Sequence, residues 1–111
     1  MKIVLTGGLG HIGSAFLQQA PKILPDAHIV VIDDLSTQRY CSLFDLPKSL
    51  SYEFIEGRIQ DIDMSKHLNG ADALIHLGAT TDAAGTAHNP NLIFDNNLPA
   101  TESLIQDCIE Y

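Results

Sequence analysis

The feature that most constrains this chain is a run of glycines close to its N-terminus. The segment Thr6–Gly13 reads TGGLGHIG and lies between a short apolar run and an amphipathic stretch. Gly7 permits a tight turn, Gly10 leaves the backbone open to a ligand, and Gly13 allows a helix to pack closely on the preceding strand. A helix that begins here presents free N–H groups to a phosphate. The pattern predicts the strand, turn and helix that open a dinucleotide-binding βαβ unit.

Short apolar runs alternate with helix-like segments along the rest of the chain. The expected strands are residues 2–6, 28–32, 51–55 and 73–77, and the expected helices are residues 11–20, 63–69 and 90–111. Residues 28–32 are apolar without interruption, which is typical of a strand buried on both faces. The polar stretch 36–51 is expected to be a loop with a short helix. This alternation favours a single α/β domain over residues 1–111, with a parallel sheet and right-handed crossovers.

Prolines and glycines set the expected helix boundaries. Pro21 and Pro25 are expected to end the first helix, in which Ile12, Ala15, Phe16 and Gln19 stand at helical spacing. Gly70 is expected to follow the second helix in the C′ position. In the last helix Asn89 is the expected cap and Pro90 the first helical residue, and Pro99 predicts a kink or a restart.

The composition limits the partners that are expected. The chain has 111 residues and a net charge of −8, and this charge disfavours nucleic acid and anionic membranes. No apolar run approaches the roughly 20 residues of a membrane span, and the start of the chain lacks a signal-peptide pattern. Cys41 and Cys108 match no metal or redox spacing and are expected to be reduced thiols. The expected location is the cytoplasm.

An acidic pair follows the second expected strand. Asp33 lies twenty residues after Gly13. A carboxylate at this place accepts hydrogen bonds from the ribose hydroxyls of adenosine and repels a 2′-phosphate, so it favours NAD over NADP. Arg39 works against that preference. Because successive strand residues point to opposite faces, only one of Asp33 and Asp34 is expected to face the ribose.

The histidines raise the question of a metal site. They are His11, His28, His67, His76 and His88. No two of them stand four residues apart, as a pair of histidine ligands on one helix face would, and no metal site is predicted. His76 ends an apolar strand, and a hydrogen-bonded core histidine is the expected role there rather than a catalytic one.

Five segments in register resemble the extended short-chain dehydrogenase/reductase family, in its NAD-dependent epimerase/dehydratase branch. They are TGGLGHIGS (6–14), DDLS (33–36), EGRIQD (56–61), LIHLGA (74–79) and DNNL (95–98). The resemblance implies the N-terminal half of a Rossmann-type doubly wound sheet with strand order 3-2-1-4. It also implies a site for NAD at Gly7, Gly10, His11, Ile12, Gly13, Asp33, Asp34, Leu35, Ser36, Arg58, Ile59, Leu77, Gly78, Ala79, Thr80 and Asn96. The loop Thr80–Asp82 is expected to contact the cofactor, and a contact with the substrate stays open. For Asp82 a plain polar loop is an equal alternative.

The chain also departs from the family pattern. Arg58 replaces the acid that typically receives the adenine amino group, so adenine is expected to rely on Ile59 and backbone groups, or Arg58 turns outward. The family's catalytic Tyr-x-x-x-Lys pair is absent, because Tyr40, Tyr52 and Tyr111 are not followed by Lys four residues on. No catalytic residue is therefore predicted, and the chain is interpreted as the N-terminal portion of a longer enzyme.

The resemblance implies a nucleotide-sugar epimerase or dehydratase that works by transient hydride transfer to NAD. Two alternatives stay open, a non-catalytic NAD-sensing or regulatory module and a related NAD-dependent reductase on a non-sugar substrate. The last helix carries an apolar stripe, whose simplest role is core packing, formed by Leu92, Ile93, Leu98, Leu104, Ile105, Cys108 and Ile109. In the family this helix also pairs across a homodimer, and that role stays open here as well.

Overall fold

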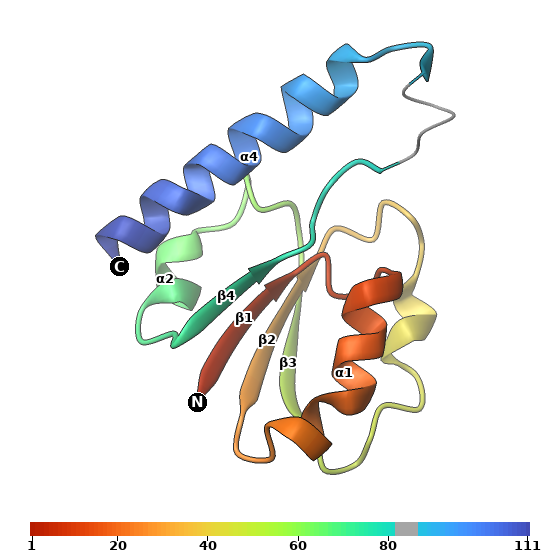
Figure 1. The fold of residues 1–111 in the computed structure, drawn as a ribbon, viewed down its shortest axis with the longest axis vertical. Helices are drawn as coiled ribbons and strands as arrows, with labels where there is room; N and C mark the ends of the chain where they lie inside the picture. The colour runs from red at the N-terminus through yellow and green to blue at the C-terminus, as the bar shows by residue number, and fades with distance from the viewer. Residues whose placement is uncertain (82–86) are drawn as a thin grey trace.

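The computed structural model describes residues 1–81 and 87–111, which form one parallel sheet with helices on both sides (Figure 1). The strands are β1 (Lys2–Thr6), β2 (His28–Asp33), β3 (Ser51–Glu56) and β4 (Ala73–His76). Their spatial order is β3-β2-β1-β4 and every pairing is parallel, so the predicted order is confirmed. The register places Thr6 between Ile32 on one side and His76 on the other. All four strands therefore end at the same edge of the sheet.

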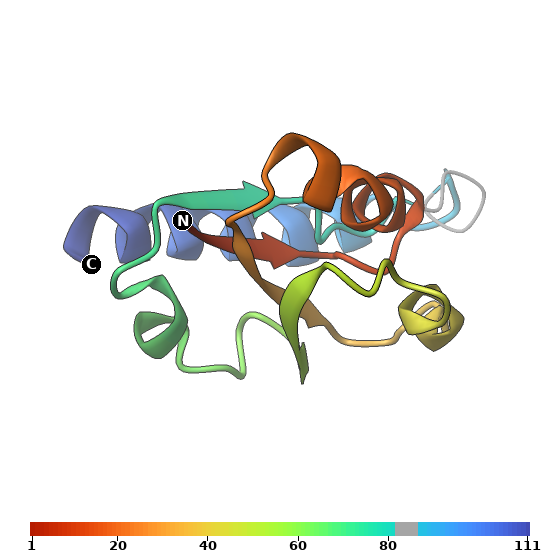
Figure 2. The ribbon, with the colours of Figure 1, turned by 90° about the horizontal axis from the view of Figure 1, so that it is seen from below.

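The helices cover the two faces of the sheet separately, as Figure 2 shows in the edge-on view. They are α1 (His11–Ile23), α2 (Met64–Leu68) and α4 (Asn91–Glu110), and a 3₁₀ helix, η1 (Tyr40–Leu43), interrupts the loop after β2. Leu17 of α1 packs with Leu5 and Val31 on one face, whereas Leu104 of α4 packs with Val4 on the other. The alternation of side chains along each strand produces these two cores.

The central strands are buried on both faces, as the apolar run 28–32 predicts. Val30 and Ile32 of β2 belong to the core beneath α2 and α4, and Ile29 and Val31 belong to the core beneath α1. None of these four side chains is more than 1% exposed. Full burial of an aliphatic side chain of this size contributes about 1.5–3 kcal/mol, so the two cores supply much of the stability of the sheet.

The first helix runs further than its sequence prediction. It continues through Pro21 to Ile23, and the N–H of Leu24 still donates to the carbonyl of Ala20 at 2.8 Å. Pro21 lies in the last turn, where one missing hydrogen bond does not stop the helix, and the chain leaves the helix at Leu24 before Pro25. Of the helically spaced positions, Phe16 packs against the core beneath α1, whereas Ile12 is 72% exposed. The buried positions are Gly13, Leu17 and Ala20.

The second helix follows its prediction closely. It is capped by Asp63 and Asn69, and Gly70 has a φ of +71°. This left-handed conformation is the one expected of a glycine in the C′ position.

The last helix is slightly shorter and more exposed than the sequence suggests. It begins at Asn91, one residue after the expected Pro90, although Pro90 itself has helical dihedral angles. It runs through Pro99 to Glu110 as one element, so the predicted restart does not occur. Within the predicted apolar stripe, Leu104 alone is classed as buried among the described residues, and Ile109 is 75% exposed. Core packing within this chain therefore does not account for most of the stripe.

The edge strand β4 pairs with β1 on one side only in the described part of the chain. Among the described residues no helix is both long enough and apolar enough to cross a membrane.

Candidate functional site

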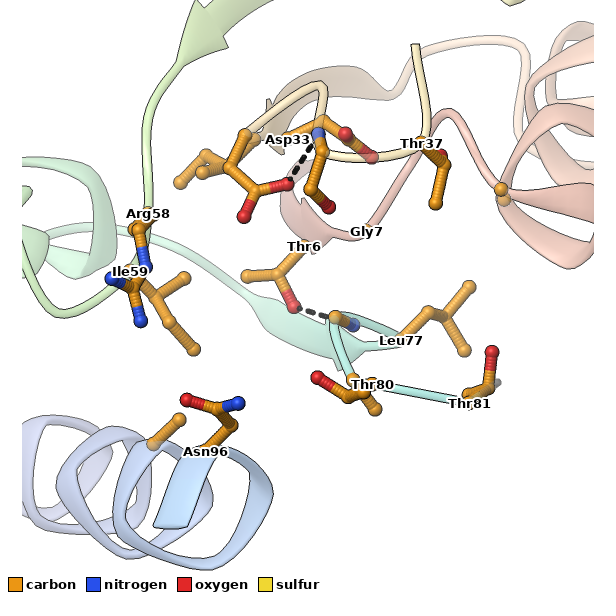
Figure 3. Close-up of a pocket in the computed structure, with 18 of the residues that line it drawn as sticks. Thr6, Gly7, Asp33, Thr37, Arg58, Ile59, Leu77, Thr80, Thr81 and Asn96 are labelled. Carbon is orange, nitrogen blue, oxygen red and sulfur yellow. Dashed lines mark hydrogen bonds between the residues drawn. The ribbon is translucent and has the colours of Figure 1, made fainter. Parts of the chain in front are cut away.

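A cleft of about 660 Å³ opens at the edge of the sheet where the four strands end (Figure 3). Its walls come from the glycine turn after β1, the loops after β2, β3 and β4, and the first half of α4. In Figure 3 Asp33 and Thr37 lie on one side of the cleft, Arg58 and Ile59 on a second, Leu77 and Thr80 on a third. Ligands of open parallel sheets bind at this edge.

The glycine turn is shaped by close contacts that exclude side chains. Gly7 has a φ of +67°, and a Cβ atom there would lie 2.5 Å from the backbone nitrogen of Gly78. A Cβ atom on Gly13 would lie 2.5 Å from the carbonyl oxygen of Gly8, so the helix packs directly on the turn. At Gly10 the nearest atom would be 3.4 Å away, so its surroundings are more open. All three glycines line the cleft. Gly7 and Gly13 also bring two parts of the backbone into close contact, whereas Gly10 leaves room beside the turn.

The carboxylate of Asp33 is held in place by two backbone donors. The N–H of Leu9 donates to Oδ2 at 3.1 Å, and the N–H of Leu35 donates to Oδ1 at 3.0 Å. Each carboxylate oxygen has a further lone pair that can accept a hydrogen bond from a ligand. Asp33 is therefore oriented at the cleft before any ligand is bound, which reduces the entropy lost when a ligand binds.

Both acidic residues after β2 contribute to the cleft, and the expectation that only one of them faces a ribose stays a prediction. Asp33 and Asp34 both line the cleft, and Asp34 Oδ1 accepts a hydrogen bond from the N–H of Ser36 at 2.9 Å. The alternation of faces holds within a strand, and β2 ends at Asp33. Asp34 lies in the following turn, where its side chain is free of that constraint.

Fifteen of the sixteen predicted cofactor residues line the cleft. The exception is Leu35, whose side chain packs against the core beneath α1. Its φ of +56° belongs to the turn that brings its N–H to Asp33. The side chain of Leu35 is therefore structural, and the contribution of this residue to the cleft is the backbone bond that orients Asp33.

Several lining residues were not predicted. They are Thr6, Ile32, Thr37, Arg39, Gly57, Gln60, Asn97 and Ala100, whereas Thr81 belongs to the predicted loop Thr80–Asp82. Most of them are adjacent in sequence to a predicted residue, and this position beside a motif could have identified them. Arg39 is different, because it comes from the polar loop after β2, and its Nη1 lies 3.1 Å from Nε2 of His11. Only the folded loop brings these two side chains together.

Behind the cleft, polar side chains tie β4 and its loop to β1 and α4. His76 Nδ1 lies 2.6 Å from Thr6 Oγ1, and His76 Nε2 lies 3.2 Å from Thr101 Oγ1. Burial lowers the pKa of His76 below its ordinary value of 6.5. Asn97 binds the backbone of Thr80 twice, at 2.7 and 3.1 Å. The predicted role of His76 as a hydrogen-bonded histidine is confirmed.

Other predictions concern residues away from these walls. Asp82, expected in the loop after β4, lies outside the described residues. Within residues 1–81 and 87–111 there is no group of three potential metal ligands. Tyr40, Tyr52 and Tyr111 are between 38% and 55% exposed, and none of them lines the cleft.

The sequence is similar to known enzymes over nearly its whole length. Residues 4–111 match the sequence model of the 3-beta hydroxysteroid dehydrogenase/isomerase family. A UDP-glucose 4-epimerase of Mycoplasma pneumoniae is 34% identical over 94% of this chain and 30% of its own length. A dTDP-D-glucose 4,6-dehydratase of Dictyostelium discoideum is 30% identical over 99% of this chain and 26% of its own length. The chain spans about a third or less of these relatives.

Solved structures show the same arrangement. The UDP-Glc/GlcNAc 4-epimerase of Campylobacter jejuni superposes with a TM-score of 0.83 and 32% identity, over 98% of this chain and 33% of that one. The UDP-glucuronic acid 4-epimerase of Bacillus cereus, solved in complex with NAD, superposes with a TM-score of 0.80 and 29% identity. That match covers 100% of this chain and 36% of the other. The four-stranded unit described above is thus a recurrent one.

Proposed function

We propose that this chain, which belongs to the NAD-dependent epimerase/dehydratase family of the extended short-chain dehydrogenases/reductases, binds NAD in the cleft at the carboxyl edge of its sheet. The observation that carries the proposal is the pre-oriented carboxylate of Asp33 beside an open glycine turn. A carboxylate that is already fixed and retains free lone pairs suits a ribose with two hydroxyl donors.

The walls of the cleft match the parts of the dinucleotide in turn. Gly10 and the N-terminus of α1 would hold the pyrophosphate, because free N–H groups and the helix dipole favour an anion there. Arg58 and Ile59 lie together at the side where adenine would be held (Figure 3). Leu77 and the loop that follows would meet the nicotinamide half, which supplies hydride transfer when it is bound.

The preference of the cleft for NAD over NADP rests on a balance of charge. Asp33 repels a 2′-phosphate, whereas Arg39 and Arg58 line the same cleft and attract one. Arg58 is exposed and Arg39 is half-buried, so solvent weakens the attraction of Arg58 in particular. The carboxylate, held by two backbone donors, cannot turn away from a phosphate without losing those bonds. We therefore assign the stronger influence to Asp33.

Calorimetry of NAD and NADP binding to Asp33→Ala tests this assignment. Truncation removes the ribose acceptor and also the two backbone bonds, so weaker NAD binding alone is ambiguous. The informative quantity is the ratio of the two dissociation constants. We expect NAD binding to weaken about tenfold or more, since charge-assisted hydrogen bonds are lost, and NADP binding to weaken much less.

The control variant is Glu110→Ala, which removes one negative charge from the exposed end of α4. It is expected to leave both dissociation constants within about twofold, because surface charges more than about 10 Å apart are largely screened at 0.1 M salt. If Asp33→Ala weakens the binding of NAD and NADP equally, the residue supports the loop but does not discriminate between the two riboses. Absence of NAD binding by the unmodified protein would contradict the proposed function itself.

The wider activity that we propose is epimerisation or dehydration of a nucleotide sugar, with this chain as the NAD-binding N-terminal portion of the enzyme. The curated relatives named above act on UDP- and dTDP-glucose according to their names. The Tyr-x-x-x-Lys pair would follow residue 111. A gene that continues past Tyr111 into this pair supports the enzyme, and a gene that stops there favours an NAD-sensing module.

A second candidate function is a reductase on a non-sugar substrate. It is favoured by the matching family model, whose description refers to hydroxysteroids. Turnover of UDP-glucose by the longest natural form, compared with a 3-hydroxysteroid, separates the two candidates. A partner surface is also proposed on α4, where Leu98, Ile105 and Ile109 are all at least half exposed. A second copy of the chain would cover such a stripe.

A further inference from the structure

His76 is a half-buried side chain at the end of β4 that connects two elements outside its own strand. Its Nδ1 atom faces the hydroxyl of Thr6 on β1, and its Nε2 atom faces the hydroxyl of Thr101 on α4. Thr6 is completely buried. Figure 3 shows the next link, in which the N–H of Gly78 donates to Thr6 Oγ1 at 3.4 Å.

The direction of these hydrogen bonds follows from what each group can donate. The hydroxyl of Thr101 donates its only proton to the carbonyl of Asn97 at 2.8 Å, because a carbonyl can only accept. Toward His76, therefore, Thr101 Oγ1 must accept, and the proton lies on Nε2. A neutral imidazole has a single N–H, so Nδ1 accepts from the hydroxyl of Thr6. Thr6 Oγ1 in turn accepts from the N–H of Gly78.

The other neutral tautomer would leave this network incomplete. A proton on Nδ1 would point at Thr6 Oγ1, which already faces the N–H of Gly78. The proton of the Thr6 hydroxyl would then have no acceptor among its contacts in the described chain. A buried hydroxyl without a partner costs about 1–3 kcal/mol, so the Nε2–H form is selected by the surroundings.

This network bears on the loop that lines the cleft. Gly7 lies so close to Gly78 that a Cβ atom would overlap the backbone of that residue. Thr80 is bound at both its N–H and its carbonyl by the side chain of Asn97. Helix α4 thus holds the loop after β4 at two points, directly through Asn97 and indirectly through Thr101 and His76.

We infer that His76, as the neutral Nε2–H tautomer, is a positioning residue that fixes the loop Leu77–Thr80 against the glycine turn and thereby shapes the cleft. It acts by orienting the hydroxyl of Thr6 toward itself, which leaves Thr6 Oγ1 to accept from Gly78. The consequence for ligand affinity rests on the proposed function, since it assumes that the cleft binds NAD. The hydrogen-bond network itself does not depend on that assumption.

The first test is the tautomer of His76 in the ligand-free protein. Long-range ¹H–¹⁵N correlation at neutral pH distinguishes a protonated Nε2 from a protonated Nδ1, and it needs no cofactor. We expect Nε2 to be protonated and Nδ1 to behave as a hydrogen-bond acceptor. The opposite tautomer, or a rapidly exchanging mixture of both, would overturn the inference.

The second test removes one link at a time with a matched control. Thr101→Val deletes the acceptor for Nε2 at nearly constant volume, and Thr101→Ser retains it. Ser103→Ala removes an exposed hydroxyl from the same helix, two residues away. We expect Thr101→Val alone to shift the amide resonances of Gly78 and Thr80 and to weaken NAD binding about three- to tenfold, as the loss of one hydrogen bond implies.

These readouts separate a positioning role from a purely structural one. A structural role would lower the unfolding midpoint of Thr101→Val but leave the Gly78 and Thr80 resonances and the NAD dissociation constant of the folded protein unchanged, and that result would overturn the inference. If the unmodified protein does not bind NAD, the proposed function fails. The tautomer and the amide shifts then still decide whether His76 positions the loop.

Discussion

The two sides of this sheet are stabilised differently, although they belong to the same parallel fold. The half built from β1, α1 and β2 is packed almost to completion, and its core side chains Leu5, Leu17 and Val31 are fully buried. The half built from β4 and α4 buries little apolar surface of its own. There Leu104 reaches the core, while Ile105 is 53% exposed, and polar side chains join the elements.

The difference shows which half is specified by local rules and which relies on particular contacts. In the first half, an uninterrupted apolar strand and a close glycine contact determine how the elements pack. In the second half, the position of α4 depends on the hydrogen bonds that Asn97 makes with Thr80 and that Thr101 makes with His76. Substitutions should therefore lower the free energy of unfolding most at the glycine turn. Along α4 the loss should depend on whether the substituted side chain is buried or exposed.

The largest effect is expected from Gly7→Ala. A methyl group would lie 2.5 Å from the backbone of Gly78, at a φ of +67° that side chains rarely adopt. Steric overlap with backbone and the left-handed conformation together should lower the free energy of unfolding by about 3 kcal/mol or more. Urea unfolding followed by circular dichroism measures this loss.

Gly70→Ala is the matched control, because Gly70 has nearly the same φ, +71°, but no atom within 4 Å of an added Cβ. Only the conformational penalty remains, so a loss of about 1 kcal/mol is expected. Equal losses in the two variants would show that the contact between the glycine turn and Gly78 is not tight, and the comparison of the two halves would lose its basis.

Along α4 we expect smaller losses of stability, which differ between a buried and an exposed position. Leu104→Ala removes a side chain that is 3% exposed and should lower the free energy of unfolding by about 2–3 kcal/mol through lost burial and a cavity. Ile105→Ala changes the neighbouring position, which is exposed, and should cost about 0.5 kcal/mol or less. Unfolding curves at two protein concentrations check both values.

The control variant also probes the partner surface proposed on α4. If Ile105→Ala is as costly as Leu104→Ala, and if its cost grows with protein concentration, the stripe is buried between copies of the chain in solution. The low apolar burial of this half would then belong to the isolated chain only. Concentration-independent curves with a small loss at Ile105 would contradict pairing through this stripe.

The sequence predicts the first half of the molecule better than the second for the same physical reason. Apolar runs and glycines act locally, so the strands, their order and the place of the glycine turn are confirmed. Pro21 and Pro99 misled the prediction, because each lies in a helix that is stabilised by neighbouring turns and by packing against the sheet. The burial of the stripe on α4 depends on its surroundings, which periodicity alone does not reveal.

The candidate site shows the same limit at the level of single residues. Motif positions such as Asp33 and Ile59 line the cleft, and their contact with a cofactor stays a prediction. Leu35 does not line the cleft, since its side chain packs against the core while its N–H donates to Asp33. The contact of Arg39 with His11 joins positions 28 residues apart, and only the folded loop after β2 creates it.

The smallest effect that we predict is a dependence of stability on pH through His76. Burial lowers the pKa of this imidazole in the folded protein below the value of about 6.5 expected in the unfolded chain. The unfolded state therefore takes up the proton first as the pH falls. The resulting stabilisation is fully present above about pH 6.5 and is lost as the pH falls through the folded-state pKa.

Urea unfolding of the protein and of His76→Gln between pH 7.5 and 5 isolates this contribution. The difference in unfolding free energy between them should shrink toward lower pH, because Gln has no proton to gain. Asp63 does not interfere, since its hydrogen bond from Ser65 lowers its pKa below 3.8, outside the window. A difference that stays constant with pH would show that His76 is no harder to protonate in the folded state than in the unfolded one. The polar connection between β4 and α4 would then tolerate a protonated His76. In that case the contacts with Thr6 and Thr101 would not require the neutral imidazole.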